Sequence, residues 1–349
     1  MPDDAGQLGA IEHLVVLMLE NCSFDHMLGW LCADEGSVSP SKQPYEGLTG
    51  AESNPDGRGG NVTVFRTDGT APHAYFMPGA DPGEGYAPTD RQLFGTSTPG
   101  TPTPTATNDG FAADYADTLV ANTATSQGHM DDATHTFTTP SVFGRLSEHG
   151  IDWTVYGYAK QPLTRGNFPD TVHAPASHFG LFTDFRAVAA GGTLPAFTFL
   201  EPSWRSTGNS QHPNYDVALG EQLIHDVYRA LRDGPAWAST LLITYDDVLV
   251  SPLIEPGTVF RVADGSTPLD HTSVLKTVEQ HWNLPSLTAR DAAAPGIGAV
   301  LTRTEARTDD PLAGVTVPLS SGTNPARHEV SHLDQVHAAL VARDLIPRT

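Results

Sequence analysis

The sequence predicts an α/β fold: a doubly wound, mostly parallel sheet with helices on both faces and long surface loops. Three short apolar segments favour this class, at residues 14–19, 196–200 and 241–245. Each is long enough for a strand and nearly free of polar residues, as expected for parallel strands that are covered on both sides. Helical patterns alternate with these segments, and that alternation is typical of parallel sheets.

The first strand, at residues 14–19, is followed at once by Glu20 and Asn21 and then by a predicted helix. Ser23 is placed to cap this helix. Its inner face is expected to carry His26, Met27, Trp30 and Leu31. Because ligands bind at the carboxyl ends of strands in such sheets, Glu20 and Asn21 are expected to face a crevice. The simpler alternative is that these polar side chains only cap the end of the strand.

A long segment at about 35–110 separates this first unit from the next. It is rich in Gly, Pro, Thr and Asp and lacks the periodicity of a packed element, which predicts surface loops with a short strand at 62–65. Chain length allows one large core. We therefore expect residues 1–349 to form a single α/β domain with a loop-rich insertion at about 35–110.

Capping residues and glycines mark the bounds of the later helices. Thr139 and Pro140 are expected to begin a helix, which Gly150 ends before a strand at 151–156. The strand at 196–200 precedes a helix at 217–231, whose leucines and valine recur at helical spacing. The remaining expected helices lie from 270 to 282 and at about 329–345.

The composition narrows the class of partner. The chain has 41 acidic and 19 basic side chains and a formal net charge of −22, which argues against nucleic acid and anionic membranes as partners unless a cation intervenes. With only two cysteines, neither a disulfide framework nor a cysteine-based zinc site is indicated. We see no leader peptide and no transmembrane run, and expect a cytoplasmic protein.

Oxygen-bearing side chains follow two of the predicted strands. Glu20 and Asn21 follow the first, and Asp246 and Asp247 follow the strand at 241–245. Such oxygens suit a divalent metal ion, with Ca²⁺, Mg²⁺, Mn²⁺ and Zn²⁺ all compatible. Carboxylates brought together without a cation would repel each other. The alternative is that the aspartates belong to an ordinary loop after a strand.

A series of motifs occurs in a specific order along the chain. It includes Glu-Asn-Cys-Ser-Phe-Asp-His at 20–26, Glu-Pro at 201–202, His-Pro at 212–213, Ile-Thr-Tyr-Asp-Asp at 243–247 and Asp-His-Thr-Ser at 270–273. In these motifs, from about residue 11 to 295, the chain resembles the bacterial phosphoesterase family. That family contains non-specific phospholipases C and an acid phosphatase and is related to the alkaline phosphatase fold.

The resemblance implies roles for the residues of these motifs. It implies that a metal ion is held by Glu20, Asn21, Asp246 and Asp247. It also implies that His212 contacts the phosphate or the leaving group. The implied activity is metal-dependent hydrolysis of a phosphomono- or phosphodiester, in a phosphorylated small molecule or a phospholipid head group.

The chain departs from the family where the nucleophile is expected. Family members carry a Gly-Pro-Thr-x-Pro-Asn-Arg turn whose Thr or Ser attacks phosphorus, and this chain passes from Thr118 to Thr125 without it. The candidate replacements are Thr118, Thr125, Ser126 or a water molecule at the metal, and none has the family's flanking motif. Since losing a nucleophile costs several orders of magnitude in rate, we expect turnover to be weak or undetectable.

Two other interpretations stay open at this point. The chain could be a catalytically impaired or repurposed member that binds a metal or an anionic ligand without turnover. It could also fold poorly, because a missing segment would leave a gap in a parallel sheet. His271, in the first turn of a predicted helix, and Cys22, where the family has Arg, are more simply a capping-turn histidine and a half-buried thiol.

Overall fold

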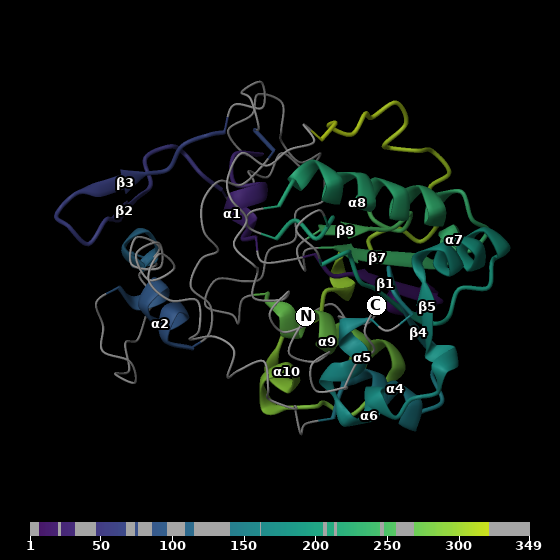
Figure 1. Ribbon diagram of the computed structural model, residues 1–349. Helices are drawn as coiled ribbons and strands as arrows, with labels where there is room; N and C mark the ends of the chain where they lie inside the picture. Colours follow the sequence, from purple (N-terminus) through teal and green to yellow (C-terminus); the bar gives the residue numbers. More distant parts are fainter. Residues whose placement is uncertain are drawn as a thin grey trace.

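A six-stranded sheet in the order β5-β4-β6-β1-β7-β8 forms the core of the protein (Figure 1). All neighbouring strands are parallel except β7 and β8, which are antiparallel. The bounds are β1 (His13–Leu17), β4 (Trp153–Gly157), β5 (Phe179–Leu181), β6 (Phe197–Leu200), β7 (Thr240–Thr244) and β8 (Val248–Val250). The predicted α/β class with a mostly parallel sheet is confirmed.

The structure is a computed structural model, and it describes the following parts of the chain. The described residues are 7–19, 22–31, 47–67, 74–75, 86–95, 109–114, 140–160, 162–204, 208–212, 215–244, 248–255 and 269–320. Within these ranges, the six strands form one hydrogen-bonded sheet, and no helix combines the length and apolar character needed to cross a membrane.

The helices lie on both sides of the sheet, while a hairpin and α2 lie beside it (Figure 1). The helices are α1 (Phe24–Met27), α2 (Tyr86–Phe94), α4 (Val142–Glu148), α5 (Leu163–Asn167), α6 (Pro169–Val172), α7 (Phe182–Gly191), α8 (Val217–Arg232), α9 (His271–Trp282) and α10 (Ala289–Ala293). Short 3₁₀ turns occur at Leu8–Ala10, Ala176–His178, Trp237–Ser239 and Gly298–Val300. The hairpin pairs β2 (Ser53–Pro55) with β3 (Asn61–Thr63).

Strand β1 is buried on both faces. Leu14 and Val16 belong to a core cluster that includes residues of α4 and α9. Val15 and Leu17 point to the opposite face, where the second cluster includes residues of α7 and α8. Double coverage explains why this segment is uninterrupted in its apolar character rather than alternating.

Several predicted elements have different bounds in the structure. The helix after β1 is a single turn, which Ser23 caps by accepting a hydrogen bond from the His26 backbone N–H. The expected inner face is wrong, because His26 is exposed and Met27, Trp30 and Leu31 are only partly buried. The chain turns sharply at Gly29, where an added Cβ would lie 2.4 Å from the Asp25 carbonyl oxygen.

The start of α4 is also corrected. Its N-cap is Ser141, whose hydroxyl accepts a hydrogen bond from the Gly144 N–H at 3.1 Å, so Pro140 precedes the cap. The predictions for α8 and for α9, which Asp270 caps, are confirmed. The predicted strand at 62–65 overlaps β3 (Asn61–Thr63) of the β2–β3 hairpin but extends two residues too far. The helix expected at 329–345 lies outside the described residues.

Candidate functional site

Three neighbouring parallel strands end level with one another at one edge of the sheet. Leu17, the last residue of β1, is in register with Leu200, the last residue of β6, and with Thr244, the last residue of β7. The segments that carry the predicted metal ligands therefore leave two adjacent strands at the same edge. Those ligands, Glu20, Asn21, Asp246 and Asp247, lie outside the described residues, so their convergence stays a prediction.

The residues that flank these segments are buried. Leu19 is 5% exposed and Thr244 is 1% exposed. The Thr244 hydroxyl is buried and has no hydrogen-bond partner among the described residues. Within those residues, no three His, Cys, Asp or Glu side chains are grouped closely enough to hold a metal ion. This edge of the sheet therefore has a buried hydroxyl oxygen, that of Thr244, two residues before Asp246. The ligands predicted to follow it carry hard oxygen donors, as divalent cations prefer.

A described carboxylate, Glu201, follows β6 at this edge. It is 2% exposed, and its two oxygens accept hydrogen bonds from the backbone N–H groups of Leu163 at 2.8 Å and Thr164 at 2.7 Å. The Trp204 indole N–H also donates to it at 3.3 Å. Burial raises the pKa of the Glu201 carboxyl. Because both oxygens bind the start of α5, Glu201 is a structural support beside the site.

His212 lies in a buried loop, residues 208–212, between β6 and α8. The side chain is 1% exposed, and its ring lies beside that of Tyr215, with the centroids 5.4 Å apart. The Tyr215 hydroxyl donates a hydrogen bond to the Trp204 carbonyl at 3.1 Å. The His212 backbone N–H donates to the Ser210 hydroxyl at 3.3 Å. These contacts hold the imidazole in one buried position.

A hydrogen bond joins the loop of His212 to the segment after β1. The Cys22 thiol donates to the Gln211 carbonyl at 3.1 Å. Cys22 directly follows Asn21, and Gln211 directly precedes His212. The loop therefore lies against the chain that leaves the end of β1. Sequence reasoning gave Gln211 no role, because the contacts that fix it come from parts of the chain far apart in the sequence.

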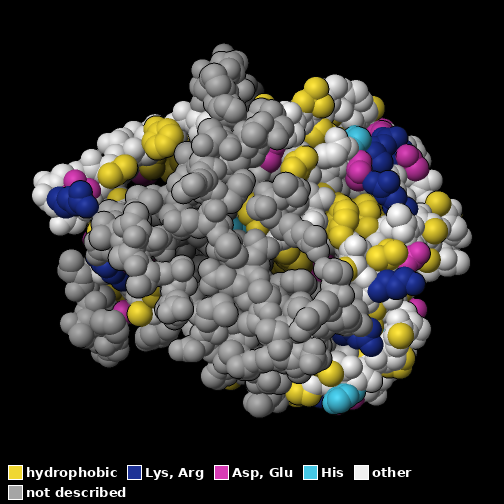
Figure 2. All heavy atoms as spheres, in the orientation of Figure 1, with side chains coloured by type: hydrophobic (Ala, Val, Ile, Leu, Met, Phe, Trp, Pro, Cys, Tyr) yellow, Lys and Arg dark blue, Asp and Glu magenta, His cyan; other side chains and the backbone are white. Residues whose placement is uncertain are grey.

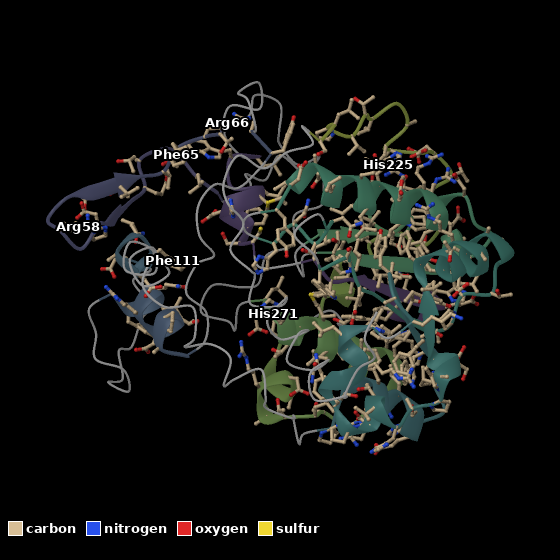
Figure 3. The ribbon with its side chains drawn as sticks, in the orientation of Figure 1. Arg58, Phe65, Arg66, Phe111, His225 and His271 are labelled. Atoms are coloured by element: carbon tan, nitrogen blue, oxygen red, sulfur yellow. The ribbon has the colours of Figure 1, made fainter. Side chains whose placement is uncertain are left out.

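His271 occupies the first turn of α9 and is exposed. Figure 3 shows it at the start of that helix. Its neighbour Asp270 accepts a hydrogen bond from the Thr272 N–H at 2.8 Å and pairs with Arg290 at 2.6 Å. The Thr272 hydroxyl and Arg290 lower the pKa of Asp270 to about 2. Asp270 is thus an ionised helix cap.

The net negative charge is locally balanced on part of the described surface. Figure 2 shows basic side chains interspersed with acidic ones on the side of the molecule where α7 and α8 lie. The ion pairs there include Arg186 with Asp226 at 2.6 Å and Arg229 with Asp233 at 3.2 Å. This part of the surface therefore offers no uniformly charged patch to a ligand.

Comparison with known proteins relates the chain to one family. The family model described as "Phosphoesterase family" matches residues 11–121 and 101–248, more than half of the chain. Similar proteins include three from Arabidopsis thaliana. Non-specific phospholipase C6 is 28% identical over 415 residues, covering 90% of this chain and 77% of that protein. Non-specific phospholipase C1 is 28% identical over 390 residues (82% and 70%), and non-specific phospholipase C3 is 25% identical over 421 residues (88% and 76%).

The alignment with one relative is longer than this chain itself. The alignment with non-specific phospholipase C6 spans 415 residues, whereas the whole chain has 349. The relative therefore carries stretches that this chain lacks.

Proposed function

We propose, from the premise that this chain belongs to the phosphoesterase family, that it is a metal-dependent hydrolase of phosphate mono- or diesters with slow turnover. Membership of the family and its similarity to non-specific phospholipases C support a hydrolase of the phosphoesterase type. The metal, the substrate and the rate are the additional parts of the proposal.

The level ends of β1, β6 and β7 are the observation that carries the metal part of the proposal. The two adjacent strands β1 and β7 end at the same edge, and the predicted ligands follow in the sequence within four residues of Leu17 and Thr244. In this proposal Glu20, Asn21, Asp246 and Asp247 would hold a divalent cation, whose donor set of hard oxygens suits Mg²⁺, Ca²⁺, Mn²⁺ or Zn²⁺. A cation there would offset the charge that develops on the phosphate oxygens.

His212 would act on the substrate from the neighbouring loop. Its ring is buried and its position is fixed by the contacts of residues 208–212. An imidazole held this way can donate a hydrogen bond to a phosphate oxygen or a proton to the leaving group. The bond from Cys22 to the carbonyl before His212 supports this role, because it ties the loop to the chain that follows β1.

Slow turnover is proposed from the missing nucleophile segment. The relatives carry stretches that this chain lacks, and the chain has no Thr-x-Pro-Asn-Arg turn between Thr118 and Thr125. The positions of Thr118, Thr125 and Ser126 lie outside the described residues. A second candidate function, binding of a metal or anion without turnover, follows from the same observation.

A hydrolysis assay on the purified full chain tests the proposal. The substrates are bis(p-nitrophenyl) phosphate, p-nitrophenyl phosphate and phosphatidylcholine micelles, each measured with EDTA and after adding back Mn²⁺, Mg²⁺, Ca²⁺ or Zn²⁺. We expect slow hydrolysis that EDTA abolishes and that Asp246→Asn eliminates. The matched control is Asp233→Asn, which removes an exposed carboxylate from the ion pair with Arg229 and should leave the rate unchanged.

Metal binding separates the two candidate functions. Calorimetric titration with Mn²⁺ should show binding that is weakened in Asp246→Asn and kept in Asp233→Asn. Binding without any hydrolysis would favour the second candidate. Hydrolysis that survives both EDTA and Asp246→Asn would contradict the proposed metal site.

A further inference from the structure

Gln211 has an unusual backbone conformation next to His212. Its φ angle is +62°, in the left-handed region, and among the described non-glycine residues only Gln211 and Asn283 have a positive φ. Asn283 ends α9, where this conformation is common. Gln211 instead lies in a loop and is 0% exposed. A non-glycine residue keeps such a conformation when its surroundings impose it, and such residues cluster at functional sites.

The surroundings that impose it include the first turns of α8. The Gln211 side-chain amide donates to the Val217 carbonyl at 3.1 Å and to the Glu221 carboxylate at 2.9 Å. Its aliphatic part lies against Gly220, where an added Cβ would be 2.0 Å from Gln211 Cγ. The glycine therefore makes room for the glutamine, and the side chain is anchored to a long helix of the core.

The backbone of Gln211 faces a different partner. Its carbonyl accepts the hydrogen bond from the Cys22 thiol at 3.1 Å, on the segment that follows β1. The next residue in the chain is His212, which is 1% exposed. The side chain of Gln211 therefore binds α8, and its carbonyl binds the segment that follows β1. These two contacts hold the residue that directly precedes His212 in the chain.

We infer that Gln211 is a positioning residue, which fixes His212 at the edge of the sheet where β1 and β7 end. The left-handed turn lets one residue direct its side chain to α8 and its carbonyl to Cys22. The catalytic consequence rests on the proposed function, because it requires that His212 acts on a phosphate ester. The structural part, that Gln211 keeps His212 buried, can be tested without any activity.

The experiment measures solvent access to His212 in the full chain. The rate of hydrogen–deuterium exchange at the imidazole C2 position is followed by mass spectrometry for the peptide that contains His212. The variants are Gln211→Ala, which loses the anchors and strains the turn, and Gln211→Gly, which loses the anchors but tolerates the positive φ. Asn283→Ala is the matched control, because it places alanine at the other positive φ, away from this loop.

We expect exchange at His212 to accelerate roughly tenfold in Gln211→Ala, since access to a buried group follows the free energy of local opening. Gln211→Gly should accelerate it less, and Asn283→Ala should leave it unchanged. Thermal unfolding of each variant reports the global fold. Unchanged exchange in a folded Gln211→Ala variant would overturn the inference. Global unfolding of both Gln211 variants would also overturn it, because the residue would then serve the whole core.

Turnover then separates this inference from the proposed function. If the chain hydrolyses bis(p-nitrophenyl) phosphate, Gln211→Ala should lower kcat about tenfold or more with little change in KM, since misplacing a catalytic group affects the transition state more than binding. If His212 becomes accessible but neither wild type nor variant hydrolyses any ester, the positioning role stands and the proposed hydrolase function fails.

Discussion

Substitution of Gly220 by alanine should destabilise the protein, although alanine is the better helix former. Gly220 lies inside α8, and in an exposed helix this exchange gains up to about 1 kcal/mol. Here the new Cβ would lie 2.0 Å from Cγ, 2.5 Å from Cδ and 2.8 Å from Nε2 of Gln211. The glutamine cannot simply swing away, because it is fully buried and anchored at its amide end.

The expected magnitude follows from what must give way. If the Gln211 side chain is displaced, two partly buried hydrogen bonds are lost at about 1 kcal/mol each. If it stays, overpacking costs about 1–3 kcal/mol. Subtracting the helix gain of about 1 kcal/mol leaves a net loss in the free energy of unfolding of about 1 kcal/mol if the side chain is displaced, and of up to about 2 kcal/mol if it stays.

Urea unfolding of four proteins provides the assay: wild type, Gly220→Ala, Gln211→Ala and the double variant. In the Gln211→Ala background the obstacle is absent, so Gly220→Ala should change sign and stabilise by about 0.5–1 kcal/mol. The reversal of sign is the specific expectation. Stabilisation by Gly220→Ala in both backgrounds would refute the packing of Gln211 against α8, and with it the anchor on which the placement of His212 depends.

Three further outcomes concern other parts of the structure. Burial and the neighbouring Asp291 raise the pKa of Glu279 above its ordinary value of 4.5. The contribution of Glu279 to the free energy of unfolding is therefore fully present below pH 4.5 and is lost as pH rises through the raised pKa. Glu279→Gln should remove this pH dependence, which urea midpoints from about pH 4 to 8 measure. Glu201→Ala leaves two backbone N–H groups of α5 without their acceptor and should cost about 2–4 kcal/mol by thermal unfolding, whereas Glu201→Gln should cost less. Cys22→Ala removes the hydrogen-bond donor to the Gln211 carbonyl. It should speed hydrogen–deuterium exchange at the His212 imidazole by about two- to fivefold and lower the free energy of unfolding by about 1 kcal/mol or less. An unchanged exchange rate would mean that the hydrogen bond from Cys22 does not restrain the loop at 208–212.

The pKa of Asp291 is shifted in the opposite direction from that of Glu279, so its effect on stability has the opposite pH dependence. Burial alone would raise the pKa of Asp291, but hydrogen bonds from Glu279, Thr288 and Leu287 lower it to about 2. Its stabilising contribution is therefore present above the ordinary value of 3.8 and is lost as pH falls toward 2. The two carboxyl groups consequently favour stability over different pH ranges.

The elements that sequence reasoning found are those whose pattern is local. The strands β1, β6 and β7 are apolar runs, and α8 repeats its buried residues at helical spacing. The strands β5 and β8 were missed because each has only three residues, too few for a periodic signal. Helix α7 could have been predicted from the sequence, because its buried residues Phe182, Phe185 and Ala189 recur at helical spacing.

The candidate site divides in the same way. Polar residues after two predicted strands indicated which edge of the sheet should hold the site. The register shows that β1 and β7, which precede the predicted ligands, end level with each other. The anchoring of the loop at 208–212 could not be foreseen. The conformation of Gln211 depends on Gly220 and Cys22, which come together only when the whole sheet has formed.

The pairing of β1 has a consequence for how the protein is made. Its two partners, β6 and β7, begin at Phe197 and Thr240. At about 5–20 residues per second, a ribosome needs roughly 10–45 s to reach the end of β7 after β1 has been synthesised. Until β6 has been synthesised, the nascent chain carries an apolar strand with both hydrogen-bonding edges vacant, and until β7 follows, one edge stays vacant as a template for aggregation. Production of this protein should therefore depend on chaperones that cover the growing chain, and a chain truncated before β7 should be a client for degradation.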